Sequence, residues 1–268
     1  MGGERAEESR SKHSFNTVAA TYARFRRGAP REVFDRIVAA GHLAAGSRVL
    51  EIGCATGQVS VPLAALGVEL TAVELGPDLA AIARRNLAPF PNARVDIGAF
   101  EDHPVPERPF DAVVAAVSFH WLDPAVRGPK AARALRCGGR LVVVHPHHVA
   151  GGTAEYFRES HRFYLKWGLS DDPLWAVPEA ADMPWMYPEL DQLQEFSSVT
   201  RERIDHTASF TTEDYVGLLG TDSLVLTLAP PARAGFLRDI AALIDDHFGG
   251  RIDRRYLYEI VTATRGDR

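Results

Sequence analysis

Short apolar runs alternate with alanine-rich amphipathic stretches between residues 31 and 145. Each apolar run is nearly continuous, which is typical of strands whose sheet is covered on both faces. Strands that alternate with helices predict βαβ units, right-handed crossovers and a parallel sheet. The predicted strands are 48–52, 69–73, 93–97, 110–116 and 139–145, and the predicted helices are 57–66, 78–87 and 124–135.

The pattern changes after His145. Residues 150–195 are rich in Tyr, Phe and Trp, and prolines interrupt any long helix there, so we expect a helical, aromatic-rich insertion. Two more strands are predicted over Val199–Phe210 and Arg255–Thr264, with helices near 212–220 and 231–248 between them. Thr212 and its neighbours provide a plausible cap for the first of these helices.

The fold class that follows is α/β, a doubly wound, seven-stranded and mostly parallel sheet with a helical cap. We expect residues 1–13 to form a disordered tail and residues 14–146 to form a Rossmann-like core. Residues 147–198 are then the cap, and residues 199–268 add the last two strands and two helices of the cap.

Composition narrows the partners. The chain has 268 residues and a net charge of −5, which argues against a polyanion such as nucleic acid. Cys54 and Cys137 are too few for a disulfide framework, and there is no apolar run long enough to span a membrane. We therefore expect a cytoplasmic protein with no membrane or nucleic-acid partner; the sequence specifies no oligomeric state.

A glycine-containing turn follows the first predicted strand. Gly53 and Gly57 allow a tight turn and a close approach of backbone to a ligand. Glu74 ends the next strand, 23 residues after Glu51, where an acidic side chain can accept hydrogen bonds from ribose hydroxyls. Ala55 replaces the middle glycine of the dinucleotide fingerprint, which favours a nucleoside ligand without a pyrophosphate.

These motifs together resemble the class I S-adenosylmethionine (SAM)-dependent methyltransferases, in their small-molecule, type 11-like branch. The resemblance rests on several segments in the family's order, with Ala55 for Gly and Cys137 for Pro as departures. The matching segments are the lid Phe15–Pro30, the loop Val49–Gly57, the acidic loop Val73–Asp78, the adenine loop Gly98–Asp102, the strand and loop Phe110–Asp123, and the turn Ala134–Leu141.

The resemblance implies SAM as cofactor and a role for each matching residue. Glu51 orders the first loop, Glu74 binds the ribose hydroxyls, and Arg26 with Tyr22 pairs with the carboxylate of the cofactor. The implied cofactor-binding residues are Tyr22, Arg26, Glu51, Gly53, Ala55, Gly57, Glu74, Leu75, Ala99, Phe100, Glu101, Ala116 and Val117.

The acceptor side is predicted less narrowly. His120 is the candidate general base, because imidazole titrates near neutral pH; alternatively it only caps a helix or packs on Trp121. Arg158 and Arg162 share a helix face and either grip an anionic acceptor or are solvated. The expected substrate-binding residues are His120, Trp121, His145, Tyr156 and Trp167, although the cap aromatics must also form a core of their own, and no metal site is expected.

The predicted function is SAM-dependent methyl transfer to a small organic molecule, on oxygen, nitrogen or carbon. One alternative is a SAM-binding protein that uses the cofactor for other chemistry. A nucleotide-dependent oxidoreductase is disfavoured by Ala55 and by the absence of a Tyr-x-x-x-Lys pair. A nucleic-acid methyltransferase is disfavoured because the loop from Val117 to Trp121 lacks the Asn/Asp-Pro-Pro motif that grips a flipped base.

Overall fold

The structure is a computed structural model that describes residues 14–105 and 107–267, so the predicted disordered tail, residues 1–13, lies outside the described residues. The described chain forms two compact units. The sheet unit contains residues 27–146, 185–204 and 258–267, and the helical unit contains residues 14–26, 147–184 and 205–257. The predicted domain limits at 14–146, 147–198 and 199–268 stay a prediction.

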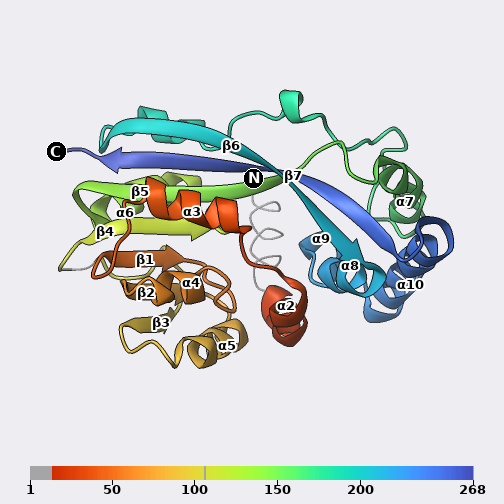
Figure 1. Ribbon diagram of the computed structural model, residues 1–268, viewed down its shortest axis with the longest axis horizontal. Coiled ribbons are helices and arrows are strands. Elements are labelled where there is room, and N and C mark those ends of the chain that lie inside the picture. Colours follow the sequence, from red (N-terminus) through yellow and green to blue (C-terminus); the bar gives the residue numbers. More distant parts are fainter. Residues whose placement is uncertain (1–13, 106, 268) are drawn as a thin grey trace. The chain divides into compact units, whose positions relative to one another are not determined.

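The strands form one seven-stranded sheet in the order β3-β2-β1-β4-β5-β7-β6. The pairings of β1 with β2 and β4, of β2 with β3, and of β4 with β5 are parallel. Figure 1 shows the arrowhead of β7 opposite to that of β4, so the sheet is mixed, and the predicted α/β, seven-stranded, mostly parallel class is confirmed. The strands are β1 (Arg48–Ile52), β2 (Glu69–Glu74), β3 (Ala93–Ile97), β4 (Phe110–Ala116), β5 (Leu135–His148), β6 (Phe196–Thr211) and β7 (Arg251–Arg265).

Helices cover both faces of the parallel part of the sheet. Along β4, Ala112 and Val114 pack into the cluster that contains Ile37 of α3, whereas Val113 packs with Ala131 of α6. This alternation explains why the strand is apolar throughout. The helices of this unit are α3 (Arg31–Ala40), α4 (Ser60–Ala65), α5 (Pro77–Leu87), η2 (Phe119–Trp121), α6 (Pro124–Ala134) and η4 (Pro188–Gln192).

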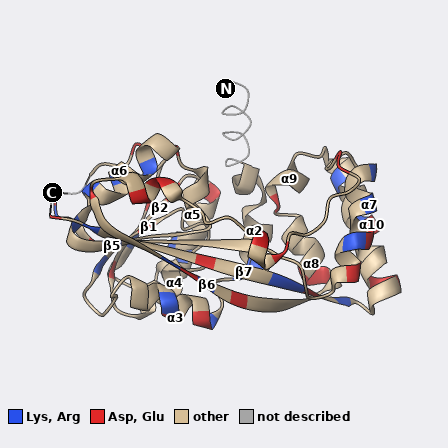
Figure 2. Cartoon of the chain, turned by 90° about the horizontal axis from the view of Figure 1, so that it is seen from above, with Lys and Arg blue, Asp and Glu red and all other residues tan. Residues whose placement is uncertain are grey.

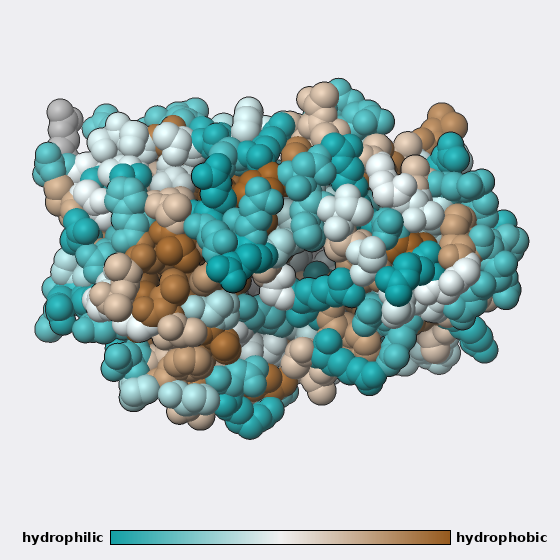
Figure 3. All heavy atoms as spheres, viewed as in Figure 1, coloured by the Kyte–Doolittle hydropathy of each residue, from teal (hydrophilic) through white to brown (hydrophobic). Residues whose placement is uncertain are grey.

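The outer side of α3 and α4 is also partly apolar. Phe34, Val38 and Val61 are half-buried and pack against the same cluster. Figure 3 shows brown, hydrophobic atoms gathered over the region where Figure 1 draws these two helices. The helices therefore bury more than one narrow stripe against the sheet.

The helical unit has an aromatic core. Tyr156 is 1% exposed, and its ring lies 5.5 Å from that of Tyr215 and 5.6 Å from that of Phe248, each edge to face. Such pairs stabilise beyond the area they bury. The helices of this unit are η1 (Phe15–Val18), α2 (Ala19–Phe25), α7 (Ala154–Lys166), η3 (Ala180–Asp182), α8 (Thr212–Leu219), α9 (Ser223–Leu226) and α10 (Pro230–Phe248).

The main departures from the predicted elements concern the ends of strands. The fifth strand runs from Leu135 to His148 instead of 139–145, because residues 135–138, Gly138 included, lie within it rather than before it. The strand pairs with β4 through a register shift between Phe110 and Ala112, which accommodates the irregularity. Among the described residues, no helix is both long and apolar enough to cross a membrane.

The core of the sheet unit makes a simple stability prediction. Val113 is 0% exposed in the middle of β4, whereas Val105 is 45% exposed in the loop before that strand. We expect Val113→Ala to lower the free energy of unfolding by about 2 kcal/mol or more, because it removes buried methyl groups and leaves a cavity. Urea denaturation measures this, with Val105→Ala as the control that changes it by less than about 0.5 kcal/mol. Equal effects of the two variants would contradict the observed packing.

Candidate functional site

The loop that leaves β1 is held in an unusual backbone conformation. Gly53, Ala55 and Gly57 have φ angles of 69°, 49° and 96°, all in the left-handed region that favours glycine. Val117, which follows the adjacent strand β4, has a φ of 59°. Two of the four described non-glycine residues with such angles therefore lie at two neighbouring strand ends. Backbone strain that persists in a fold concentrates at functional sites, so these strand ends are the first candidate.

Ser118 explains why glycine stands at position 53. A Cβ built on Gly53 would lie 2.5 Å from the Cβ of Ser118 and 3.1 Å from its Oγ. The Ser118 hydroxyl donates a hydrogen bond to the carbonyl of Ile52. The loops after β1 and β4 thus touch each other directly, and the space beside Gly53 is filled by the protein itself.

Glu74 joins the first two strand ends. Its carboxylate accepts a hydrogen bond from the Ala55 amide at 2.8 Å and another from the Gly76 amide at 2.8 Å, and the side chain is 7% exposed. A carboxylate has about four acceptor positions, so these two bonds leave capacity for a ribose hydroxyl. Burial raises the pKa of Glu74, and the amides, that of Leu75 included, act against this shift. The role predicted for Glu74 is compatible with this geometry.

Glu51 is buried beneath the same loop at 2% exposure. Burial raises the pKa of Glu51 to about 7, the Ser60 hydroxyl lowers it, and the nearby Glu74 raises it further. A group with this pKa changes charge close to neutral pH, and a neighbouring cation would favour its ionised form. Glu51 is therefore suited to respond to a positively charged ligand at this edge of the sheet.

His120 lies in η2, just beyond β4. Its ring centroid is 4.8 Å from that of Trp121 and 5.1 Å from that of His145, so these three predicted substrate-binding residues lie together. Its Nδ1 is buried and has no hydrogen-bond partner among the described residues. Burial, with a contribution from the Arg127 charge, lowers the pKa of His120 to about 4. The imidazole is neutral at physiological pH and has a free acceptor or donor nitrogen.

Arg127 holds the wall behind His120. Its guanidinium forms an ion pair with Glu189 and donates to the carbonyl of Phe119 at 3.1 Å. It also lies over the rings of Phe119 and Tyr187, at 5.2 Å and 4.8 Å from their centroids. These contacts fix η2 in place, and the charge of Arg127 disfavours a proton on His120.

The predicted adenine-side residues occupy different depths. Phe100 is 3% exposed and belongs to the core beneath the loop, whereas Leu75 and Ala99 are partly exposed. The Glu101 carbonyl accepts a hydrogen bond from Lys130 at 2.6 Å. Their contacts with a cofactor stay predictions, as do those of Ala116 and of the residues in the β1 loop.

Other predicted residues belong to the helical unit. Arg26 donates to the hydroxyl and carbonyl of Thr221, at 2.8 Å and 2.9 Å, and lies over the ring of Tyr22. Tyr156 is in the aromatic core, and Trp167 packs on α10, where its indole nitrogen donates to Asp239 at 2.8 Å. These contacts give each residue a structural role within this unit, and the predicted roles toward cofactor and substrate stay predictions.

Sequence reasoning missed two residues that shape the first loop. Ser118 buttresses Gly53, and Asn86 of α5 donates to the Thr56 carbonyl at 2.8 Å. Both are polar residues on other elements, so no spacing within the loop points to them. The one available signal was the polar Ser118 directly after an apolar strand.

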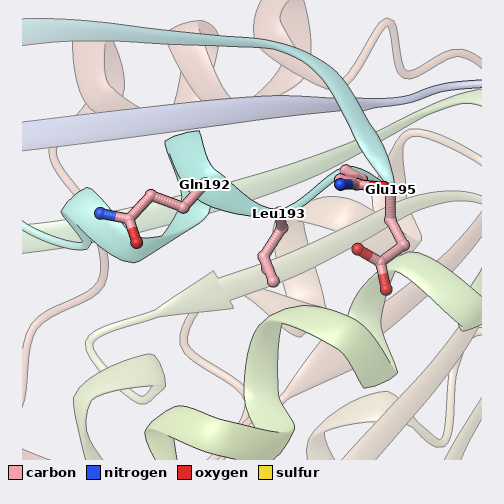
Figure 4. Close-up of a pocket in the computed structure, with 4 residues that line it drawn as sticks. Gln192, Leu193 and Glu195 are labelled. Carbon is pink, nitrogen blue, oxygen red and sulfur yellow. The ribbon is translucent and has the colours of Figure 1, made fainter.

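A hollow of about 440 Å³ lies elsewhere on the sheet unit. It is lined by Gln192, Leu193, Gln194 and Glu195, between η4 and β6, and Figure 4 shows Leu193 pointing down toward the helix below it. That helix is α6, since a Cβ on Gly128 would lie 2.5 Å from Leu193. None of these residues is a predicted site residue, and the hollow has no group suited to catalysis beyond a surface carboxylate.

Replacing Glu74 tests the first two strand ends. We expect Glu74→Ala to weaken SAM binding by about 1.5–3 kcal/mol, because it removes a charged acceptor and releases the Ala55 and Gly76 amides. Calorimetry measures the affinity. Glu69→Ala, at the exposed start of the same strand, is the control and leaves it unchanged. Unchanged affinity in Glu74→Ala would remove this carboxylate from the site.

Gly53 and Gly46 separate backbone strain from steric contact. Both have a left-handed φ, but a Cβ on Gly46 meets nothing within 4 Å. We expect Gly46→Ala to cost only about 1 kcal/mol of stability and to leave SAM affinity unchanged. Gly53→Ala adds the collision with Ser118, so it lowers both stability and SAM affinity. If calorimetry and thermal unfolding show the same results for both variants, the contact with Ser118 affects neither stability nor SAM affinity.

Comparison with known proteins agrees with this geometry. Residues 49–139 match the methyltransferase domain family, a range that contains the β1 loop, Glu74 and the end of β4. Uncharacterised methyltransferases of Mycobacterium bovis and Mycobacterium tuberculosis are 27% identical over 87% of this chain and 86% of their own length. A demethylmenaquinone methyltransferase of Tropheryma whipplei is 32% identical over 45% of the chain and 51% of its own length.

The fold is similar to that of the YcgJ protein of Bacillus subtilis, with a TM-score of 0.56 and 15% identity over 89% of this chain and all of the other. The sheet order, the glycine turn after β1 and the acidic end of β2 agree with the family match, and they leave no reason to retain the oxidoreductase alternative. The match to the methyltransferase domain over residues 49–139 and the methyltransferase relatives together support a class I methyltransferase that uses SAM as its cofactor.

Proposed function

We propose that the protein transfers the methyl group of SAM to a small organic acceptor. The observation that carries this proposal is the group of His120, Trp121 and His145 at the carboxyl end of β4. Aromatic walls with a few polar nitrogens are typical of pockets for small organic ligands. Ligands of open α/β sheets bind beyond the carboxyl ends of the strands, where these residues lie.

Charge supports a small acceptor over a nucleic acid. The chain carries a net charge of −5, and Figure 2 shows acidic and basic positions interspersed along β6 and β7. A protein that binds a polyanion usually presents a basic stripe instead. The relative from Tropheryma whipplei, whose name describes methylation of demethylmenaquinone, also supports an organic acceptor. We also propose that the protein is cytoplasmic.

The residues of the sheet unit divide the work. SAM supplies an electrophilic methyl group on a sulfonium when it is bound. Hydrogen bonds from the Ala55 amide to Glu74 and from Ser118 to the Ile52 carbonyl hold the strand-end loops, and fixed loops favour in-line placement of two reactants. The neutral His120 accepts a hydrogen bond from an acidic group of the methyl acceptor and orients it, and its low pKa limits it to partial proton removal. A carboxylate acceptor needs no base.

The alternative is a protein that uses SAM for a reaction other than methyl transfer. Calorimetry with SAM, S-adenosylhomocysteine and NAD tests the cofactor, and mass spectrometry of small organic acceptors incubated with SAM tests the reaction. We expect binding of the first two ligands only, and products that are heavier by one methylene with release of S-adenosylhomocysteine. SAM binding with conversion of a substrate without that mass gain would favour the alternative.

His120 gives the proposal its sharpest kinetic prediction. If it takes the acceptor proton, His120→Asn lowers turnover by about 10²–10⁴-fold and leaves SAM affinity unchanged. Because burial lowers the pKa of His120 to about 4, the neutral form persists as the pH falls, and activity is constant from about pH 5 to 8 and lost only below that range.

His42→Asn is the control, since His42 is an exposed residue with a left-handed φ that asparagine tolerates. Steady-state kinetics and a pH profile measure both variants. A decrease in turnover of less than about threefold in His120→Asn would assign this residue to the pocket wall. An acid limb near pH 6.5 in the native enzyme would contradict the buried, neutral imidazole.

A further inference from the structure

The strand β7 carries two consecutive arginines in opposite surroundings. Successive side chains of a strand point to opposite faces, so Arg254 and Arg255 do not share an environment. Arg255 is fully partnered: its Nε lies 2.9 Å and 3.0 Å from the carboxylate oxygens of Asp205, and its Nη1 donates to the carbonyl of Ala150 at 2.9 Å. This arginine has an evident structural role.

Arg254 has no such partner. Its side chain forms no hydrogen bond and no ion pair with any residue that the structure describes, and its Nε is buried. Its guanidinium carbon lies 5.0 Å from the ring centroid of Tyr256, a cation–π contact on the same face of the strand. The side chain as a whole remains partly accessible. A buried donor without an acceptor is costly, and proteins leave few of them unexplained.

The surroundings of Arg254 are aromatic. His148, at the end of β5, lies 6.5 Å from the ring of Tyr256 and 4.4 Å from that of Phe157 on α7. The Nε2 of His148 is also buried and has no hydrogen-bond partner among the described residues. Two nitrogen groups that can donate therefore lie near one another between apolar rings, all within the helical unit.

The charged side chains that act on one another here are Arg254 and Asp222. Burial and the Arg254 charge lower the pKa of His148 to about 3, so this imidazole is neutral. Burial by itself lowers the pKa of Arg254, but nearby acidic groups raise it and the guanidinium stays charged; these groups are Tyr215, Tyr256, Tyr164 and Asp222. The Asp222 carboxylate accepts from the Leu224 amide at 3.0 Å, as the cap of α9, and forms no ion pair with Arg254.

We propose that Arg254 binds the carboxylate of a small organic anion, with His148 beside it and the rings of Tyr256 and Phe157 against the organic part. A planar guanidinium fork matches a carboxylate with two parallel hydrogen bonds. All of these residues belong to the helical unit, and none is a predicted cofactor or substrate residue, so the site goes beyond the proposed function.

A carboxylate fits this site better than a phosphate. One guanidinium balances one negative charge, whereas a phosphate dianion would keep an uncompensated charge in a partly buried place. Neutral His148, whose buried Nε2 has no partner among the described residues, can supply a further donor without further charge. The aromatic rings favour a ligand with an apolar body, which inorganic phosphate lacks.

Calorimetry on the full chain with acetate, benzoate and inorganic phosphate tests the proposal. We expect benzoate to bind more tightly than acetate, and both carboxylates more tightly than phosphate. Arg254→Gln weakens benzoate binding by about tenfold or more, the loss expected when a charge-assisted pair is removed. Arg251→Gln, an exposed arginine at the start of the same strand, keeps the native affinity.

Thermal unfolding without ligand separates a binding role from a structural one. An unpaired arginine that serves a ligand destabilises the ligand-free protein. We therefore expect the melting temperature of Arg254→Gln to equal that of the native protein or to exceed it. A lower melting temperature would indicate a structural role and overturn the proposal. It is also overturned if neither carboxylate binds, if phosphate binds most tightly, or if Arg254→Gln binds benzoate as the native protein does. SAM binding, measured in the same samples, reports on the proposed function separately.

Discussion

One buried carboxylate organises the candidate site. Glu74 ends β2, yet its two oxygens accept hydrogen bonds from Ala55, after β1, and from Gly76, at the start of α5. These hydrogen bonds fix the positions of both loops, and Gly53 can then approach Ser118 in the loop after β4. Without this carboxylate, two backbone amides at the sheet edge would lose their partner, at a cost typical of buried unsatisfied donors.

The same arrangement sets the electrostatics of the strand ends. Glu74 lies close enough to Glu51 to raise the pKa of that carboxyl. Burial raises the pKa of the Cys54 thiol, and the charges of Glu51 and Glu74 raise it further. Because the pKa of Glu51 is raised to about 7, this carboxyl favours a cationic ligand, whose binding stabilises the charged carboxylate. SAM is cationic at its sulfonium and its ammonium group. Beyond β4 the site favours a neutral group instead, because burial and the Arg127 charge lower the pKa of His120 and keep its imidazole neutral.

The sequence predicted the elements well wherever the pattern was local. The third strand spans Ala93–Ile97 as expected, and the helix from Pro124 ends at Ala134, one residue before its predicted end. The extension of β5 past Gly138 was not predictable, because glycines within an irregular strand look like a turn. The acidic residue Glu74 was predictable because its spacing from the first loop can be read from the sequence. Its bond with the Ala55 amide and the contact of Gly53 with Ser118 were not, because they join segments that are distant in the chain.

Arginine shows how partners distinguish structural from functional roles in this chain. Arg127 and Arg203 are partly or fully buried, and each has a carboxylate partner, Glu189 or Glu259. Burying a charge is tolerable when such a partner repays the lost hydration, and removing the partner is then strongly destabilising. Arg254 departs from this pattern, because its partly accessible side chain has no acceptor among the described residues, and the buried Nε of Arg140 is likewise without a partner there. We infer that a ligand supplies the acceptor that Arg254 lacks, because selection tolerates an unpaired charge of this kind where binding depends on it.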